Sequence, residues 1–540
     1  MKIALCQINT TVGNYDYNKD KILNYYSNAI NLNADIVVFP ELAITGYPPQ
    51  DLLLEKGFVT DNQFVLNEIA AQTTVPMIIG FVRKENGRLY NSAALCQNGK
   101  IIDNYDKILL PTYDVFDEDR YFENGKVPGI WEIETNGKKV NVGIQICEDL
   151  WDREYDTKVS KLQKEKGAEL IINISASPYH EGRITERQEL IKEKVKEIKI
   201  PFLYCNLIGA QDELIFEGES LAYNANCEQI AQGKVFEEDL IIVDTATASK
   251  KEYPVLPSEE KLYNALCLGV KDYFRKTGHS EALIGLSGGI DSALVACIAT
   301  DALGANKVHG VSMPSHFSSG HSKSDAKQLA ANLKINYETI AIQDVVNSYE
   351  TLLKPQFKET KRNVAEENIQ ARTRGNILMA LSNKFGWMVL STGNKTEIAL
   401  GYCTLYGDMS GGLSVISDLS KIDVYRVARW VNQIAGYDRI PQSTVDKEPS
   451  AELAEDQVDP FDYGVVSPLV DAIIEERKSP RELIEKGADR ELIMRLYRLI
   501  RNNEFKRRQA APGLRVSPKA FGVGRRVPIV NHYKGSGFSD

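Results

Sequence analysis

Three residues in the first half of the chain carry polar side chains that could do chemistry. Each follows a segment that predicts a strand, and reactive groups of layered α/β proteins collect at strand ends. A cysteine thiolate is a strong nucleophile near neutral pH, a carboxylate can take its proton, and an ammonium group can stabilise an oxyanion. Taken singly, such a cysteine is more typical of a small core residue, and such charged residues of a solvated surface. The three residues are Glu41, Lys107 and Cys147.

A second segment with chemical potential is residues 286–292, which read Leu-Ser-Gly-Gly-Ile-Asp-Ser. It lies between a predicted buried strand, residues 281–286, and residues 293–303, whose apolar side chains have helical spacing. Adjacent glycines let main-chain N–H groups approach an anion at the start of a helix, which makes a phosphate-binding loop. The acid in this loop, Asp291, suggests a metal ion carried by the phosphates. A plain strand-to-helix turn is the alternative for the glycine pair alone.

The loop lacks the lysine of the GxxxxGK[ST] motif and the spacing of GxGxxG, so it predicts neither of those nucleotide-binding folds. It resembles instead the pyrophosphate loop of the N-type ATP pyrophosphatases, which split ATP into AMP and pyrophosphate while they activate a carboxylate or carbonyl. The resemblance implies that ATP contacts Gly285, Leu286, Ser287, Gly288, Gly289, Ile290, Asp291 and Ser292.

The three candidate residues of the first half stand in distinctive surroundings. Cys147 is followed by Glu-Asp-Leu-Trp, and Glu41 stands in Phe-Pro-Glu-Leu with Gly-Tyr-Pro shortly after it. These strings resemble the nitrilase superfamily, whose Glu-Lys-Cys triad these residues would form. The resemblance implies that Glu41 is the base, that Cys147 forms a thioester, and that Lys107 stabilises the oxyanion, where one donor is typically worth about 3–4 kcal/mol. Glu118 is either a supporting acid or part of a solvated loop.

The glutamine-using branch of that superfamily matches further positions of this chain. An arginine suits the α-carboxylate of a free amino acid, because its guanidinium group donates two parallel hydrogen bonds. The resemblance implies that the amide hydrolysed is that of glutamine and that glutamine binds at Tyr113, Ser177 and Arg183.

Four strings and one lysine follow the phosphate loop. In order they are Glu-Asn-Ile-Gln-Ala-Arg (367–372), Thr-Gly-Asn-Lys-Thr-Glu (392–397), Tyr-Gly-Asp (406–408), Lys421 and Glu-Pro-Ser (448–450). They resemble NAD⁺ synthetases, and with the amidase in front the whole chain resembles glutamine-dependent NAD⁺ synthetases. The resemblance implies that ATP also contacts Thr392, Lys421 and Ser450. It implies that Mg²⁺ lies on Asp291 and Glu397, and that nicotinate adenine dinucleotide (deamido-NAD) contacts Asn368, Glu397 and Lys506.

The implied reaction is the ATP-dependent amidation of deamido-NAD to NAD⁺ with ammonia from L-glutamine, which releases AMP, pyrophosphate and L-glutamate. The family assembles as oligomers, so we expect a homo-oligomer. Two other interpretations stay open. One is an amidase whose ATP domain only regulates it, and the other is a nucleic-acid-modifying ATP pyrophosphatase that uses a basic tail.

Composition narrows the class of protein. The chain has 540 residues, of which 43% are hydrophobic and 26% charged, as in globular proteins, and its net charge of −10 disfavours nucleic-acid binding. The exception is the basic tail, residues 495–526, which needs an anionic partner such as a diphosphate or is a solvated face. The cysteines form no CxxC pair, and no apolar run approaches the length of a membrane span. We therefore expect a cytoplasmic protein with small-molecule substrates and with no nucleic-acid or membrane partner.

The order of apolar segments predicts two α/β domains. Short strands, one of them over residues 202–206, alternate with helical or loop segments in the first half. Periodicity is lost where two prolines precede a helix, predicted over residues 261–277, that leads to the phosphate loop. With the resemblances, we expect an α-β-β-α nitrilase-like sandwich over residues 1–245 and a linker over residues 246–260. A doubly wound parallel-sheet ATP pyrophosphatase domain should follow over residues 261–540.

Overall fold

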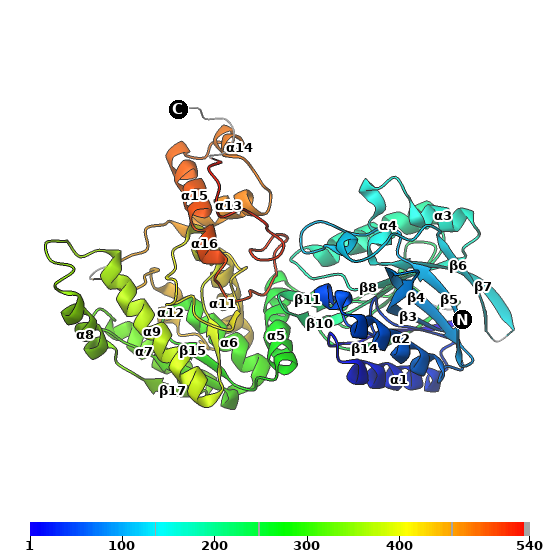
Figure 1. Ribbon diagram of the computed structural model, residues 1–540, viewed down its shortest axis with the longest axis horizontal. Helices are drawn as coiled ribbons and strands as arrows, with labels where there is room; N and C mark the ends of the chain where they lie inside the picture. The colour runs from blue at the N-terminus through cyan, green and yellow to red at the C-terminus, as the bar shows by residue number, and fades with distance from the viewer. Residues whose placement is uncertain (136, 247–248, 455–456, 534–540) are drawn as a thin grey trace. The chain divides into compact units, whose positions relative to one another are not determined.

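A computed structural model describes residues 1–135, 137–246, 249–454 and 457–533 of the chain (Figure 1). The chain divides into two compact units, Met1–Leu256 and Pro257–Asp540. Both are mixed α/β units, so the predicted fold class is confirmed. In the described part of either unit, no helix is long and apolar enough to cross a membrane.

The first unit has two sheets, each with parallel strands at its centre and antiparallel strands at its edges. In spatial order, the first sheet consists of β14 (Asp239–Asp244), β1 (Lys2–Gln7), β2 (Ile36–Val38), β3 (Met77–Glu85), β4 (Arg88–Gln97) and β5 (Lys100–Asp106). The second consists of β13 (Gln229–Gln232), β12 (Leu221–Tyr223), β9 (Phe202–Asn206), β8 (Leu170–Ser175), β7 (Lys138–Ile146) and β6 (Gly129–Thr135). A separate hairpin is formed by β10 (Ile208–Gln211) and β11 (Leu214–Glu217).

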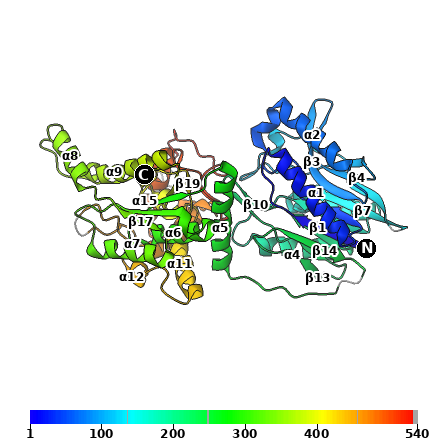
Figure 2. The same ribbon diagram turned by 90° about the horizontal axis from the view of Figure 1, so that it is seen from below.

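Helices cover the outer face of each sheet, which gives the α-β-β-α order of layers (Figure 1), and Figure 2 looks from below onto the outer helices of the first sheet. The alternation of side chains along β1 shows how the layers form. Ile3 and Leu5 pack in the core between the two sheets, whereas Ala4 and Cys6 pack in the core beneath the outer helices. The covering helices are α1 (Tyr15–Asn31) and α2 (Lys56–Ala70) on the first sheet, and α3 (Val159–Glu165) and α4 (Arg183–Ile198) on the second.

The second unit is built on one sheet in which all neighbouring strands run parallel. From β15 the chain adds strands on one side and then, from β18 onward, on the other. The carboxyl end of β15 is therefore a topological switch point, where open α/β sheets bind ligands. In spatial order the strands are β17 (Asn336–Thr339), β16 (Val308–Ser312), β15 (Ala282–Gly285), β18 (Met388–Ser391) and β19 (Leu413–Ser414).

Helices flank this sheet, and a further helical group lies beyond it (Figure 1). Around the sheet are α5 (Ser258–Thr277), α6 (Ile290–Leu303), α7 (Gly320–Leu333), α8 (Gln343–Leu353), α9 (Val364–Phe385), α10 (Lys395–Leu400), α11 (Lys421–Ala435) and α12 (Gln442–Asp446). The further group consists of α13 (Tyr463–Ile474), α14 (Pro480–Glu485), α15 (Arg490–Asn502) and α16 (Glu504–Arg507). Leu400 of α10 packs in one core with Val470 of α13 and Leu496 of α15, which joins the two groups.

One buried lysine ties several segments of this unit together. Lys395, the first residue of α10, donates through Nζ to the carboxylate of Glu475 and to Ser517 Oγ at 3.0 Å, and it lies 3.5 Å from Asp418 Oδ1. Asp418 in turn accepts the main-chain N–H groups of Val516 and Ser517 at 2.8 and 2.7 Å. A buried ammonium group is tolerated only when it is paired, so Lys395 holds these segments at fixed positions.

Replacing Lys395 with methionine should destabilise the second unit, because it leaves buried carboxylates without their cation. Breaking a buried ion pair in this way typically costs about 3–5 kcal/mol. Unfolding in urea, followed by circular dichroism, measures the loss. Lys139→Met removes a lysine that is 59% exposed and serves as the control. Equal unfolding midpoints for the two variants would contradict the role of Lys395.

Candidate active sites

The first unit buries an ammonium group between two carboxylates. Lys107 directly follows β5, and its Nζ donates to Glu41 Oε1 at 2.7 Å and to both carboxylate oxygens of Glu118 at 2.9 Å. Glu41 is held on its other sides by Asn91 Nδ2 at 2.7 Å and by the N–H of Ala176 at 2.8 Å. Glu118 is only 5% exposed, so it belongs to this cluster and not to a solvated loop. Two carboxylates that share one ammonium group leave one negative charge in excess, which suits a base.

Cys147 lies at the sharp turn where β7 ends and the short 3₁₀ helix η3 (Cys147–Leu150) begins. Its φ of +42° is in the left-handed region, which non-glycine residues adopt where surrounding contacts hold them. Burial raises the pKa of its thiol well above the ordinary value, the charge of Glu41 raises the pKa further, and Lys107 lowers it. The thiol therefore needs a base to become a nucleophile, and Glu41 is close enough for its charge to act on it.

Glu148, whose only sequence signal is its place directly after Cys147, was not predicted as a site residue. Its carboxylate accepts the hydroxyl of Tyr113 at 3.0 Å on each oxygen and the hydroxyl of Tyr155 at 3.1 Å. Burial raises the pKa of Glu148 to about 7, while the charge of Lys107 and the hydrogen bonds from the two tyrosine hydroxyls lower it. Glu148 forms no ion pair with any residue that the structure describes, so this carboxylate suits an ammonium group of a ligand.

Two further predicted glutamine-binding residues lie in the segment that runs from the end of β8 to the first residue of α4. Arg183, the first residue of α4, stacks over the ring of Trp151 at 3.6 Å, and its charge acts on Tyr113 and Glu148. Ser177 is fully buried and directly follows the residue whose N–H binds Glu41. The structure thus groups Tyr113 and Arg183 with Glu148 and brings Ser177 next to the backbone that holds Glu41.

The hydroxyl of Ser177 is held by a buried ion pair that the sequence did not predict. Arg187 Nη2 donates to Ser177 Oγ at 3.2 Å, and the same guanidinium group pairs with the carboxylate of Glu217. Both charged residues are fully buried. Their pairing depends on the approach of β11 to α4, which leaves no local signature in the sequence.

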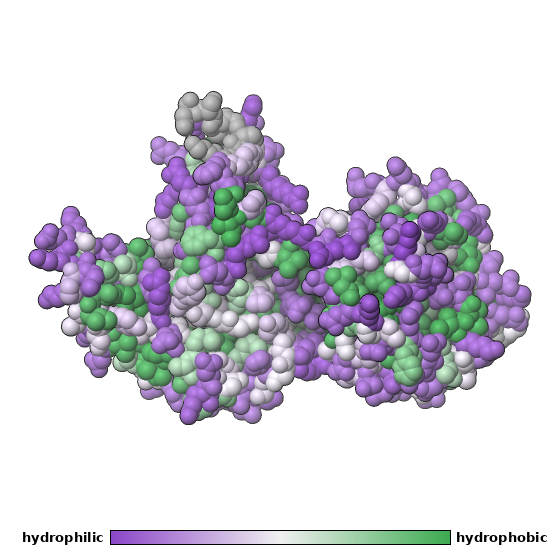
Figure 3. Space-filling model, viewed as in Figure 1, coloured by the Kyte–Doolittle hydropathy of each residue, from purple (hydrophilic) through white to green (hydrophobic). Residues whose placement is uncertain are grey.

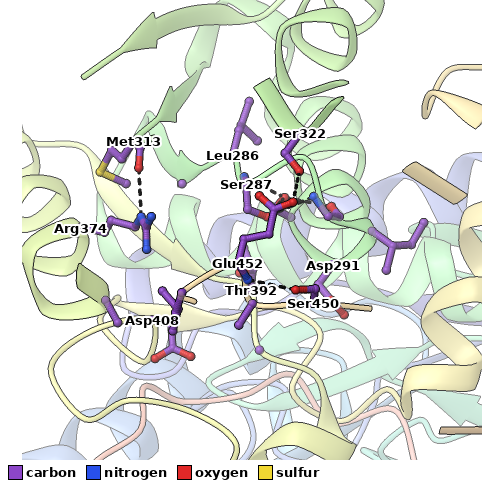
Figure 4. Close-up of a pocket in the computed structure, with 18 of the residues that line it drawn as sticks. Leu286, Ser287, Asp291, Met313, Ser322, Arg374, Thr392, Asp408, Ser450 and Glu452 are labelled. Atoms are coloured by element: carbon purple, nitrogen blue, oxygen red, sulfur yellow. Dashed lines mark hydrogen bonds between the residues drawn. The ribbon is translucent and has the colours of Figure 1, made fainter. Parts of the chain in front are cut away.

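The second unit has a pocket of about 290 Å³ at the carboxyl end of its sheet (Figure 4). Its wall comes from the loop after β15, from the ends of β16 and β18, and from the segment that follows α12. Of the predicted ATP-binding residues, the wall contains Gly285, Leu286, Ser287, Gly289, Ile290, Asp291, Ser292, Thr392, Lys421 and Ser450.

Gly288, the remaining member of the predicted loop, faces the neighbouring helix and not the pocket. Its φ is +80°, and a Cβ there would lie 2.3 Å from the main-chain oxygen of Ser322. Beside it, Ser287 Oγ accepts the N–H of Gly289 at 3.1 Å and lies 3.2 Å from Ser292 Oγ. The turn thus depends on glycine, and it leads directly into the N-terminus of α6, where an anion is favoured.

Two acids of the pocket share one lysine. Lys421 Nζ donates to Asp291 Oδ2 at 2.5 Å and to Glu397 Oε1 at 3.0 Å, and Asn394 Nδ2 donates to Asp291 Oδ1 at 2.9 Å. The acids lie in the first turns of α6 and α10, just beyond the strands that precede these helices. Burial raises the pKa of Glu397 to about 7, while the charge of Lys421 lowers it and that of Asp291 raises it.

The donors of this trio fit a Mg²⁺ ion that arrives with a nucleotide. Oxygens of Asp291 and Glu397 converge on one cation, and Mg²⁺ commonly takes one or two carboxylates together with phosphate oxygens and water. Among the described residues, no group of three or more His, Cys, Asp or Glu side chains forms a metal cage. The ion would therefore depend on substrate phosphates.

Arg374 and Glu452 are among the charged residues of the pocket that were not predicted from the sequence (Figure 4). Arg374 donates to the main-chain oxygen of Met313 at 3.0 Å, and burial lowers its pKa to about 10. Glu452 accepts the hydroxyl of Ser322 at 2.8 Å and Nζ of Lys447 at 2.6 Å. Arg374 forms no ion pair within the described part of the chain, so its guanidinium group suits an anionic substrate.

The predicted deamido-NAD contacts are only partly gathered at this pocket. Glu397 lines it, and Asn368 Oδ1 accepts the hydroxyl of Thr404, a wall residue, at 2.8 Å. Lys506 lies outside the lining, and its Nζ donates to the main-chain oxygens of Gly401 and Cys403 at 2.7 and 2.8 Å. This lysine therefore binds the carbonyl end of α10 in the present structure.

Part of the basic tail is neutralised within the second unit. Glu504 pairs with Arg507 and Arg525, both at 2.9 Å, and lies 3.6 Å from Arg508. These three arginines are therefore paired with an acid of the tail itself.

Comparison with known proteins relates both units to characterised families. The carbon-nitrogen hydrolase family model matches residues 2–254, and the NAD synthase family model matches residues 262–510. Similar curated proteins include the glutamine-dependent NAD(+) synthetases of Synechocystis sp., 42% identical, and of Thermotoga maritima, 41% identical, each with 99% of both chains covered. The solved glutamine-dependent NAD+ synthetase of Acinetobacter baumannii is 37% identical, with 98% of each chain covered and a TM-score of 0.80.

The folds and sites thus define a ligase in which a carbon-nitrogen hydrolase unit and an NAD synthase unit share one chain. The chain belongs to the family of glutamine-dependent NAD(+) synthetases. The family predicted from the motif strings is therefore confirmed.

Replacing Gly288 with alanine should weaken ATP binding by about tenfold or more, or about 1.4 kcal/mol. The added Cβ would meet main-chain atoms of the neighbouring helix and would strain a left-handed φ, so the loop must shift. Isothermal titration with ATP measures the affinity. Gly320→Ala is the matched control, because a Cβ at Gly320 meets nothing within 4 Å. Wild-type affinity in Gly288→Ala would show that the loop geometry does not matter for the nucleotide.

Proposed function

We propose that this chain amidates deamido-NAD to NAD⁺ with ammonia from L-glutamine and with ATP, and releases AMP, pyrophosphate and L-glutamate. One observation carries the proposal: a single chain holds a buried Glu-Lys-Cys cluster and, in a separate unit, a glycine-loop pocket with two lysine-bridged acids. Residues 1–245 would form the glutaminase and residues 261–540 the synthetase, with residues 246–260 as the linker.

At the glutaminase site, Glu41 takes the proton of the Cys147 thiol, and the thiolate attacks the side-chain carbonyl carbon of glutamine. Lys107 stabilises the negative oxygen that forms. The proton passes to the amide nitrogen, the C–N bond breaks, and ammonia leaves a thioester on Cys147. Water then gives a proton to Glu41, attacks the thioester and breaks the C–S bond, which yields glutamate and the free thiol.

Glutamine is recognised by opposite charges on the two sides of its α-carbon. Arg183 binds the α-carboxylate, and Glu148, which forms no ion pair with any described residue, binds the α-ammonium group. Tyr113 orients Glu148 through its hydroxyl and so acts with it. Ser177 contacts the substrate from the loop that also holds Glu41.

At the synthetase site, the nicotinate carboxylate of deamido-NAD attacks the α-phosphorus of ATP. The bond from this phosphorus to the oxygen that it shares with the β-phosphorus breaks. Pyrophosphate stays on the glycine loop, and Lys421 and Arg374 supply positive charge from the protein. When bound, Mg²⁺ held by Asp291 and Glu397 supplies further charge against the phosphate oxygens. Ammonia then attacks the acyl carbon of the adenylate. The nitrogen loses a proton and AMP leaves, which gives the amide.

The molecule is proposed to act as a homo-oligomer. Exposed apolar side chains gather on α8 and α9, and Figure 3 shows apolar residues at this end of the second unit. Three of them recur at helical spacing on one face of α8, and such patches mark interaction surfaces. The residues are Val345, Tyr349, Leu352, Met379 and Phe385.

We place the protein in the cytoplasm, since the cysteines of the described residues are all free.

Substitutions at the two sites should separate the two half-reactions. Cys147→Ala should abolish NAD⁺ formation from glutamine and leave formation from ammonium salts intact, because the thiol serves only to release ammonia. Asp291→Ala should suppress both, because activation of the carboxylate precedes the use of nitrogen. The measurement is NAD⁺ and pyrophosphate release with each nitrogen source. If Asp291→Ala kept normal ammonium-dependent turnover, Asp291 would have no part in the nucleotide site.

The affinity for glutamine should depend on pH through Glu148. Its pKa is raised to about 7, so the carboxyl group is ionised above this pH and neutral below it. Binding of the α-ammonium group needs the ionised form, and the dissociation constant should therefore rise about tenfold per pH unit below pH 7. Titration of Cys147→Ala with glutamine from pH 5.5 to 8 measures this.

Glu148→Gln in the same Cys147→Ala background is the matched control. Its dissociation constant should be high at every pH, because the amide is never charged. A pH-dependent affinity that survives in this variant would assign the titration to another group.

A further inference from the structure

A buried carboxylate of the first unit has no role in the mechanism above. Asp149 stands two residues after Cys147, is fully buried, and forms no ion pair with any residue that the structure describes. All its hydrogen bonds are to neutral donors. Oδ2 accepts the N–H of Ile146 at 2.9 Å and the hydroxyl of Tyr105 at 2.7 Å.

The other oxygen of this carboxylate binds a second segment of main chain. Asp149 Oδ1 accepts the N–H groups of Ile108 and Leu109 at 3.1 and 3.0 Å. Ile108 directly follows Lys107, just as Ile146 directly precedes Cys147. One side chain therefore joins the backbone beside the nucleophile, at the end of β7, to the backbone beside the ammonium group, just after β5, although these two strands belong to different sheets of the unit.

Only a carboxylate can make this set of bonds. Its two oxygens accept from four donors, whereas an asparagine of the same size would present an NH₂ group to two of those donors. Burial raises the pKa of Asp149 to about 6, and the N–H groups of Ile146 and Leu109 and the hydroxyl of Tyr105 lower it. The hydrogen bonds thus offset part of the cost of burying the charge.

The same carboxylate also closes the turn that carries the nucleophile. The bond from Ile146 N–H to Asp149 spans Cys147, whose φ of +42° is maintained only if contacts on both sides hold it. On the other segment, the bonds to Ile108 and Leu109 set the direction in which Lys107 leaves β5. Loss of the clamp would let the thiol and the ammonium group move apart.

We propose that Asp149 is a positioning residue of the glutaminase, which fixes the Cys147 thiol relative to the Lys107 ammonium group by clamping their two backbone segments together. This proposal rests on the glutaminase function proposed above. It adds to that function a residue that touches neither glutamine nor the reacting atoms.

Asp149→Asn tests the clamp in the full-length enzyme. The kcat of glutamate release should fall about 100-fold, the loss expected for a misplacement of about 1 Å, while KM for glutamine stays within about threefold. Ammonium-dependent NAD⁺ formation should be unchanged. Asp152→Asn is the matched control, since Asp152 is a fully buried acid close by in the chain that pairs with Lys194 and not with the Lys107 segment. It should keep kcat within about threefold.

A kcat for Asp149→Asn within about threefold of wild type would overturn the proposal, and so would a parallel change in kcat and KM that Asp152→Asn reproduces.

If Asp149→Asn does not fold, Tyr105→Phe decides, because it removes one donor to Asp149 and keeps the ring. Its kcat should fall about fivefold at unchanged KM, and an unchanged kcat would overturn the clamp. Glutaminase activity in Cys147→Ala would refute the function itself and is a separate outcome.

Discussion

A lysine ammonium group held between two carboxylates is the interaction on which both units depend. The two trios are Lys107 with Glu41 and Glu118, and Lys421 with Asp291 and Glu397. Burying such a charge is unfavourable unless its partners are fixed close by, so each trio also joins chain segments that are distant in sequence. When all of its groups are ionised, each trio carries one negative charge in excess. In the first unit that charge suits a proton acceptor, and in the second it suits a cation that accompanies phosphates.

Much of the fold followed from patterns that burial imposes on sequence. Central parallel strands are nearly continuous in apolar residues, so the predicted strand at residues 202–206 coincides with β9. Among the strands that were not predicted, β10, β11 and β13 are only four residues long and owe their order to pairing with each other or with neighbours. Helix α5 begins at Ser258, before the predicted start at Lys261, since its first turn is polar and acidic.

The candidate sites were predictable where the topology of the sheet alone decides which residues come together. Strand ends and the switch point bring Asp291, Thr392 and Glu397 to one pocket, as expected. Glu148 and Arg374 were missed, because their character comes from burial and from neighbours on other elements, which the sequence does not reveal. The catalytic and binding roles of all these residues remain predictions.

Transfer of nitrogen from glutamine to the dinucleotide tests the central claim most directly. The enzyme is given ATP, deamido-NAD and glutamine labelled with ¹⁵N in the side-chain amide, and the NAD⁺ is analysed by mass spectrometry. Our account predicts NAD⁺ labelled in its carboxamide, formed in equal amount with AMP. Unlabelled NAD⁺, or glutamate and AMP released without any NAD⁺, would contradict it.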